Sequence, residues 1–326
     1  MPAMLDYPLK FQPILKEKIW GGKKLQDLLG KKSDSDALGE SWEISGVKND
    51  ISLVENGTFK GKTINEILEQ FKEDLVGEKV YNQFGTEFPL LVKFIDAKTA
   101  LSVQLHPDDK LAKERHNSFG KTEMWYIMQA DEDAEINIGF SRTITKDEYL
   151  EYLDNGKITE LLNFEKVKKG DAYFIHPGKV HAIGAGVLLA EIQQTSDLTY
   201  RIYDWDRKDA HGNSRELHTA LALDAIDFKK KDDFRLRYEK NENKSSKIVS
   251  CQYFITNYLP VKGEIEKDYS SIDSFVIYMC VGGKAEITTN QNSETIEQGQ
   301  TILIPAQNNN VTIQAESAEL LEVYIP

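Results

Sequence analysis

Short apolar runs separated by turn residues are the feature that most constrains how this chain can fold. Runs at 88–97, 123–130, 171–177 and 186–195 are rich in β-branched and aromatic residues, and Gly, Pro, Asn or Asp bounds each of them. Such runs are typical of strands in a buried sheet. The sequence therefore predicts a mainly β protein.

Helical patterns are few. The segment 63–71 has apolar residues at helical spacing, Thr145 and Glu148 form a capping-box signature before 146–153, and 214–226 is a third candidate. We expect these helices to pack on the outside of the β structure and to carry no chemistry.

The length and the charge pattern predict two domains. A chain of 326 residues exceeds what one hydrophobic core usually organises, and the segment 228–247 is strongly charged with few apolar positions. We place the boundary there, with a catalytic domain over 1–235 and a C-terminal domain over 236–326. The Gly-to-Pro element at 299–305 resembles the one at 170–177, which indicates a duplicated barrel unit.

The second unit has no histidine, because none follows His218 in the sequence. It therefore cannot repeat metal chemistry that uses imidazole ligands. We expect the C-terminal barrel to lack metal ligands and to be structural, or to act as a lid over the first unit.

Composition narrows the partners of the chain. Its 53 acidic and 40 basic residues give a net charge of -13, which repels nucleic acid and anionic membranes. An anionic substrate would therefore need a local group of cations. With no apolar run of about 18 residues and no cationic start before an apolar core, we expect a cytoplasmic protein that contacts neither nucleic acid nor membrane.

A set of polar residues at strand positions indicates a metal site. Gln104 and His106 lie two residues apart, so their side chains share one face of a strand, and Lys121 shares a face with Glu123. A Pro-Gly turn delivers His181 at the start of a further strand. Two imidazoles, a carboxylate and an amide suit a divalent Lewis acid that keeps a position open for substrate. Of the remaining histidines, His176 is expected to support the ligands or the scaffold, and no role is expected for His116, His211 and His218.

The order of these residues resembles the cupin fold, and longer strings resemble the type I mannose-6-phosphate isomerase family in its short bacterial form. These strings follow one another across about 170 residues: GESWEIS (39–45), PLLVKFIDAKTALSVQLHPDD (89–109), GKTEMWYI (120–127), HPGKVHAIGAG (176–186) and EIQQTSDLTYRIYDWDR (191–207).

The resemblance implies two cupin-like jelly-roll barrels with a few peripheral helices. It also implies a zinc-dependent isomerase that interconverts D-mannose 6-phosphate and D-fructose 6-phosphate by proton transfer through an enediolate. Carried over by motif, one zinc ion per chain would have as ligands Gln104, His106, Glu123 and His181. Arg201 would be the catalytic arginine, and the substrate pocket would contain Ser102, Lys121 and Asp197.

Several assignments remain open at this point. The phosphate group could be bound by Lys121, Arg201 or Lys93, and the proton could be moved by Asp197, by Lys121 or by a water molecule. Glu40 and Trp42 could pack a strand or line the pocket. Three other functions compete: a non-haem iron oxygenase, a non-catalytic sugar- or metal-binding module, and an isomerase of another sugar phosphate.

Overall fold

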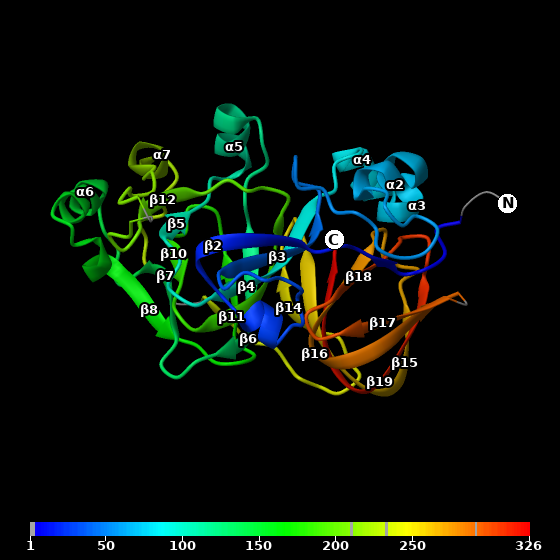
Figure 1. Cartoon of the computed structure of the whole chain (residues 1–326). Coiled ribbons are helices and arrows are strands. Elements are labelled where there is room, and N and C mark those ends of the chain that lie inside the picture. The colour runs from blue at the N-terminus through cyan, green and yellow to red at the C-terminus, as the bar shows by residue number, and fades with distance from the viewer. Residues whose placement is uncertain (1–3, 209–210, 232–233, 291) are drawn as a thin grey trace.

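The structure, a computed structural model, describes residues 4–208, 211–231, 234–290 and 292–326. Figure 1 shows two lobes, one built mainly from the N-terminal two thirds of the chain and the other containing its C-terminal strands. Strands outnumber helical elements in these residues, which confirms the predicted mainly β class.

Antiparallel sheets build the first lobe. The central sheet has the order β13 (Arg235–Leu236), β9 (Ala172–Ile175), β6 (Glu123–Ala130), β11 (Val187–Gln194), β4 (Leu90–Ala97), β3 (Leu38–Ser45) and β2 (Ile14–Gly22). The outer sheet has the order β12 (Tyr200–Tyr203), β5 (Val103–Leu105), β10 (His181–Ile183), β7 (Glu135–Phe140) and β8 (Leu162–Lys166).

The second lobe is the C-terminal sheet. Its order is β1 (Leu9–Lys10), β18 (Thr301–Ile304), β16 (Val276–Thr289), β19 (Asn310–Tyr324), β15 (Ile255–Asp268) and β14 (Ser246–Ser250), and β17 (Asn292–Glu297) pairs with β16. Within the described residues every strand order is open, so none of the sheets closes into a barrel.

The central sheet is buried on both faces, which explains why its strands read as nearly continuous apolar runs. In β4, Val92 and Phe94 belong to a core shared with the C-terminal sheet, whereas Ile95 belongs to a core shared with the outer sheet. In β6, Tyr126 belongs to the core shared with the C-terminal sheet and Trp125 to the core shared with the outer sheet. Period-two alternation thus directs one set of side chains between the lobes and the other into the first lobe.

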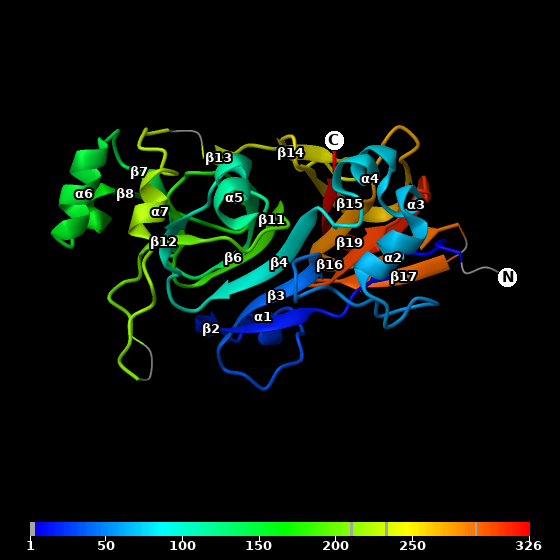
Figure 2. The ribbon, with the colours of Figure 1, turned by 90° about the horizontal axis from the view of Figure 1, so that it is seen from above.

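The helices lie at the edges of the molecule, as expected. They are α1 (Lys24–Asp27), α2 (Ile64–Phe71), α3 (Glu73–Val76), α4 (Glu78–Phe84), α5 (Asp109–His116), α6 (Lys146–Asp154), α7 (Thr219–Leu223) and the 3-10 helix η1 (Ile158–Leu161). Figures 1 and 2 show α2, α3 and α4 against the C-terminal lobe, with α6 and α7 at the opposite end.

Two of the predicted helices are confirmed together with their caps. Thr63 and Glu66 form a capping box at the start of α2, and Thr145 and Glu148 form one at the start of α6. The third prediction, a helix over 214–226, is too long.

The structure retains only α7 within that segment. Residues 215–218 instead contact β12 and Asp204, the residue that follows β12. Arg215 donates to Asp204, and the carbonyl of Glu216 accepts a hydrogen bond from Arg201. These contacts with distant residues replace the local bonds of a helix.

The N-terminal segment contributes to the second lobe. Leu9 pairs with Leu303 and Lys10 with Ile302, so β1 is an edge strand of the C-terminal sheet. The division at residues 235 and 236 stays a prediction, and it falls inside β13, which pairs with β9. In the described residues, no helix is both long and apolar enough to cross a membrane.

Candidate metal centre and the adjoining cavity

Three of the predicted ligands form a buried cluster. The Nε2 atoms of His106 and His181 each lie 3.4 Å from an oxygen of Glu123, and the side chains are almost wholly buried. Candidate ligand atoms of the three residues lie within 4.8 Å of one another. Glu123 and His181 are the first residues of β6 and β10, and His106 follows the last residue of β5.

The backbone sets the orientation of both imidazoles. The Nδ1 atom of His106 lies 2.8 Å from the carbonyl oxygen of Leu198, and Nδ1 of His181 lies 2.8 Å from that of Lys179. A carbonyl can only accept, so Nδ1 carries the proton in each ring, and Nε2 is left with its lone pair toward Glu123. This is the arrangement that a metal-binding histidine requires.

The electrostatics of the cluster favour the ligand forms of all three groups. Burial, together with the charge of Lys121, lowers the pKa of His106 to about 3, and burial also lowers the pKa of His181. Burial alone would raise the pKa of Glu123, but the charge of Lys121 and the interactions with His106 and His181 together outweigh burial and hold that pKa well below its ordinary value. At neutral pH the cluster therefore presents two neutral imidazoles and one carboxylate.

The cluster also contains buried polar atoms that make no hydrogen bond. Within the described residues, Nε2 of both histidines and both carboxylate oxygens of Glu123 are buried and make no hydrogen bond. Buried polar atoms are normally paired, since each unpaired group costs free energy. These atoms belong to three residues whose candidate ligand atoms lie within 4.8 Å of one another, and such a group fits a divalent metal ion.

Strand register places two further predicted residues beside the cluster. Gln104 in β5 pairs with His181 in β10 on one side and with Arg201 in β12 on the other. Directly paired residues of antiparallel strands present their side chains on the same face. His181, Gln104 and Arg201 therefore form a row across the outer sheet.

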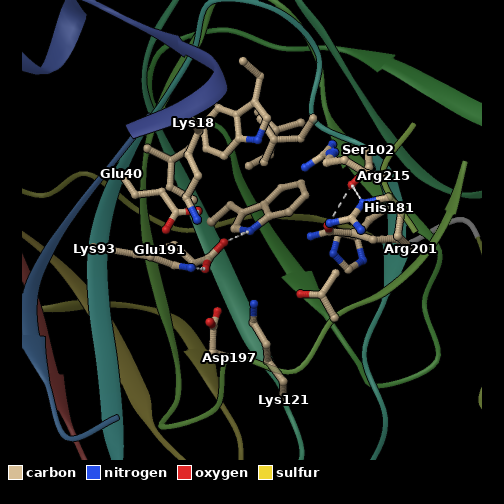
Figure 3. A pocket seen from close by; sticks show the side chains of 17 residues that line it. Lys18, Glu40, Lys93, Ser102, Lys121, His181, Glu191, Asp197, Arg201 and Arg215 are labelled. Atoms are coloured by element: carbon tan, nitrogen blue, oxygen red, sulfur yellow. Dashed lines mark hydrogen bonds and ion pairs between the residues drawn. The ribbon is translucent and has the colours of Figure 1, made fainter. Parts of the chain in front are cut away.

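A cavity of about 310 Å³ opens beside this row, between the outer and central sheets. Figure 3 shows His181, Arg201, Arg215 and Ser102 grouped on one side of it. The cavity is lined by Lys18, Trp20, Glu40, Lys93, Ile95, Leu101, Ser102, Gln104, Lys121, Trp125, His181, Ile183, Glu191, Asp197, Thr199, Arg201 and Arg215.

The predicted pocket residues all line this cavity. Ser102 Oγ donates to Gln104 Oε1 at 3.3 Å and accepts from Arg201 Nε at 3.3 Å. Lys121 is buried with Nζ 3.4 Å from Glu123 Oε2, whereas Asp197 is exposed at the cavity edge. The roles predicted for these residues and for Gln104 stay predictions.

His218, for which no role was expected, helps to place Arg201. The backbone N–H of Arg201 donates to Nδ1 of His218 at 3.0 Å, and the N–H of His218 donates to the carbonyl of Arg201 at 2.7 Å. Arg201 Nη1 donates to the carbonyl of Glu216 at 2.9 Å. No pattern in the sequence pointed to this contact, because it depends on how the chain returns after β12.

A buried ion pair forms the opposite wall of the cavity. Lys93 Nζ lies 2.9 Å from Glu191 Oε1, and Trp125 Nε1 donates to Glu191 Oε2 at 2.8 Å. Sequence reasoning missed Glu191, although a lone charge in the apolar run of β11 was a usable signal, since a buried charge needs a partner.

The open question about Glu40 and Trp42 is also answered. Glu40 lines the cavity, where Lys18 lies 3.5 Å from its Oε1, and Trp42 is buried and donates Nε1 to Glu40 Oε2 at 2.7 Å. Trp42 thus holds the carboxylate that faces the cavity.

Comparison with known families gives two matches along the chain. Residues 9–154 match the family described as phosphomannose isomerase type I, catalytic domain, and residues 244–325 match the mannose-6-phosphate isomerase cupin domain.

Individual relatives match over nearly the whole length. The mannose-6-phosphate isomerase ManA of Bacillus subtilis is 37% identical over 305 residues, which cover 93% of this chain and 94% of the relative. The mannose-6-phosphate isomerase of Streptococcus mutans is 34% identical over 299 residues, covering 91% and 92%.

A solved structure has the same fold. The crystal structure of the mannose 6-phosphate isomerase from Bacillus subtilis matches with a TM-score of 0.88 and 35% identity, and the match covers 98% of this chain and 100% of that one. A putative mannosephosphate isomerase from Archaeoglobus fulgidus shares the fold at 22% identity, with a TM-score of 0.78 over 99% of both chains.

Proposed function

Because this chain belongs to the type I phosphomannose isomerase family, we propose that it interconverts D-mannose 6-phosphate and D-fructose 6-phosphate with one bound zinc ion. The observation that carries the metal part of the proposal is the group of unpaired ligand atoms of His106, Glu123 and His181. We infer that Gln104 completes the ligand set, since its register places it next to His181.

Zinc fits the donor set because nitrogen and oxygen donors with a single carboxylate are typical of sites that keep a position for substrate. A bound zinc ion supplies a Lewis acid that polarises oxygens of the substrate. The protein supplies an aromatic wall beside it, since Trp125 lines the cavity and packs edge-on against His181, with ring centroids 5.4 Å apart.

The reaction moves a proton between C1 and C2 of the open-chain sugar. A base must take the proton from the carbon beside the carbonyl and return it to the neighbouring carbon. Lys121 Nζ and the carboxylate of Asp197 both line the cavity, so either can carry the proton at those atoms. Both remain candidates, as does a water molecule.

Negative charge builds on the substrate oxygens while the proton is absent. We assign its stabilisation to Arg201, which lies in the row with Gln104 and His181. Its side chain donates to the hydroxyl of Ser102 and to the backbone carbonyl of Glu216. Both acceptors are neutral, so the positive charge of Arg201 is available to a ligand. Preorganised donors of this kind contribute most when water is excluded.

An assay of the purified protein with mannose 6-phosphate tests the proposal, with fructose 6-phosphate measured through a coupling enzyme. We expect activity to fall when a chelator removes the metal and to return when zinc is added, with elemental analysis giving one zinc per chain. His181→Ala should lose both zinc and activity.

The matched control is His176→Ala, since His176 is an exposed histidine at the end of β9 and contacts Phe174. This variant should retain zinc and activity. Folded, zinc-loaded protein that does not isomerise mannose 6-phosphate would contradict the proposal and direct attention to another sugar phosphate.

A further inference from the structure

One end of the cavity carries arginines from two segments. Arg201 lies in β12, and Arg215, from the described segment that begins at residue 211, lies in the same cavity wall. Figure 3 shows Arg201 and Arg215 on the same side, across the cavity from Lys93 and Glu191. Nothing in the sequence analysis pointed to Arg215.

Asp204 holds Arg215 in place. This carboxylate is 6% exposed and accepts hydrogen bonds from Arg215 Nε at 2.7 Å and from Nη2 at 2.5 Å. Arg207 Nη2 also donates to Asp204 at 3.1 Å and to the carbonyl of Ala100 at 2.7 Å. The two-pronged contact fixes the plane of the Arg215 guanidinium group at the cavity.

The charges at this end are unbalanced. Arg207 and Arg215 donate to the carboxylate of Asp204, and the charges of Asp204 and of the exposed Glu216 both act on Arg201, so three guanidinium groups lie near two carboxylates and leave a net charge of +1. Burial and the charge of Arg215 lower the pKa of both Arg201 and Arg207. In a protein of net charge -13, such a concentration of positive charge needs an anion nearby.

The cavity's other cations lie beside carboxylates of their own. Lys93 is 2.9 Å from Glu191, Lys18 is 3.5 Å from Glu40, and Lys121 is 3.4 Å from Glu123. Lys93 and Lys121 were the alternatives that the sequence left open for the phosphate. Each of these lysines is matched by one carboxylate, whereas three guanidinium groups lie near two carboxylates at the arginine end, which is therefore the stronger anion site.

We propose that Arg215 binds the phosphate group of the sugar phosphate beside Arg201, and that Asp204 is the positioning residue that aims Arg215. Nε and Nη2 of Arg215 donate to Asp204, which leaves Nη1 to donate to a phosphate oxygen, and a phosphate monoester carries nearly two negative charges at pH 7, which suits the excess of positive charge in this group. This inference rests on the proposed function, since it concerns the same substrate.

Steady-state kinetics of Arg215→Gln with mannose 6-phosphate test the inference. We expect KM to rise about tenfold to a hundredfold, the range for losing a charge-assisted hydrogen bond, while kcat changes less. Arg215→Lys, which keeps the charge without the fork, should give a smaller rise and covers the case in which the glutamine variant does not fold.

Arg115→Gln is the matched control. Arg115 also binds a carboxylate, that of Asp224, but it lies outside the cavity lining. The substitution Arg115→Gln removes the same charge from the protein as Arg215→Gln, so an effect of net charge alone would appear in both variants. We expect the KM of this control to equal that of the wild type.

Binding of inorganic phosphate gives a readout that does not depend on turnover. Calorimetry on chelator-treated protein separates binding at the arginines from binding to a metal ion. We expect Arg215→Gln to weaken phosphate binding at least tenfold relative to the wild type and to the Arg115→Gln control. Unchanged phosphate affinity together with unchanged KM would overturn the inference.

The positioning role of Asp204 is tested by a double-mutant cycle in KM. Asp204→Asn should raise KM alone, but it should add less than about twofold when Arg215→Gln is already present, because the two residues act as one unit. Fully additive effects would contradict the role of Asp204. A wild type that does not isomerise mannose 6-phosphate would instead count against the proposed function.

Discussion

Single residues in the cavity show how this protein keeps charges inside a β structure. Lys93 and Glu191 are both nearly buried, and each is stabilised by a partner: Lys93 by the carboxylate at 2.9 Å, and Glu191 also by Trp125. Burial would lower the pKa of Lys93, but Glu191 and Glu40 outweigh it and raise that pKa. Burial and the charge of Glu123 raise the pKa of Glu191, so Lys93 is the member of the pair that is held in its charged form.

The removal of Arg201 tests its role in turnover. Arg201→Ala leaves behind neutral partners, the hydroxyl of Ser102 and the carbonyl of Glu216, so it strands no buried charge. We expect kcat to fall about 10²–10³-fold, the usual cost of losing a preorganised donor, while zinc content and melting temperature stay unchanged. Steady-state kinetics and elemental analysis measure these quantities.

A small effect would remove Arg201 from the mechanism. If activity survives within about tenfold, or about 1.4 kcal/mol of transition-state stabilisation, Arg201 is not the key group. Zinc loss in the same variant would show that the arginine supports the metal site instead.

At the scale of elements, strand register brings the candidate metal ligands together. Glu123 starts β6 in the central sheet, whereas His181 starts β10 in the outer sheet, and the facing of these sheets brings the two side chains within 3.4 Å. A shift of one residue in β10 would turn His181 away from the cluster, because side chains alternate between the faces of a strand. The site is therefore only as precise as the pairing of β10 with β5 and β7.

The helix cap of α6 offers a test of stability away from the site. Thr145 Oγ1 accepts from the N–H of Glu148 at 3.1 Å, and Thr145→Ala should lower the free energy of unfolding by about 1 kcal/mol. Urea unfolding measures this, with kcat expected to stay the same because α6 lies outside the cavity lining.

Thr145→Ser keeps a hydroxyl at the cap and is the matched control. It should retain most of the stability of the wild type. An equal loss in both variants would show that packing of the threonine methyl group, and not the cap, stabilises the start of α6.

At the scale of the whole molecule, the lobes are joined by a common core. Leu9 and Phe11 from the N-terminus pack in the same core cluster as Met124 of the central sheet and Leu303 of the C-terminal sheet. The core thus spans the predicted boundary, and β1 crosses it in the backbone as well. We expect the two lobes to depend on one another for stability.

The C-terminal lobe contains a buried carboxylate that links its stability to pH. Glu322 is 1% exposed, with Lys267 Nζ 2.8 Å from one oxygen, and it accepts hydrogen bonds from Tyr269 at 2.6 Å and from Asn257 at 2.7 Å. Burial would raise its pKa, but Lys267 and these donors lower it.

The sign of the pH effect follows from this lowered pKa. The unfolded chain, in which the pKa of a glutamate is about 4.3, binds the proton first as the pH falls. The contribution of Glu322 is therefore complete above about pH 5 and is lost as the pH falls through the lower, folded pKa. Glu322→Gln should reduce the free energy of unfolding by about 3 kcal/mol at pH 7, and it should weaken the dependence on pH below about pH 5.

Urea unfolding between pH 3 and pH 7 measures both effects. Glu297→Gln is the control, because the ion pair of Glu297 with Lys284 in the same sheet is exposed. This variant should change neither the free energy of unfolding nor its dependence on pH appreciably. An unchanged pH dependence in Glu322→Gln would show that Glu322 is not held in its charged form.

The sequence by itself determined the local geometry and the chemistry of the ligands. Short apolar runs bounded by turn residues predicted β4, β6, β9 and β11 within about two residues, and capping boxes predicted the starts of two helices. The ligand types at strand positions, together with the family resemblance, predicted a cluster of His106, Glu123 and His181. Each run, each cap and each motif is contained in one short segment, where local backbone preferences and residue types can be recognised.

The tertiary structure decided what depends on contacts between distant segments. The loop that brings Arg215 to the cavity, the contact of His218 with Arg201, and the pairing of β1 with β18 all join residues whose local sequence carries no sign of the partner. Such contacts follow from strand register and from which faces pack together. Here distant contacts also overrode local preference, because hydrogen bonds to Arg201 and Asp204 shortened a predicted helix to α7.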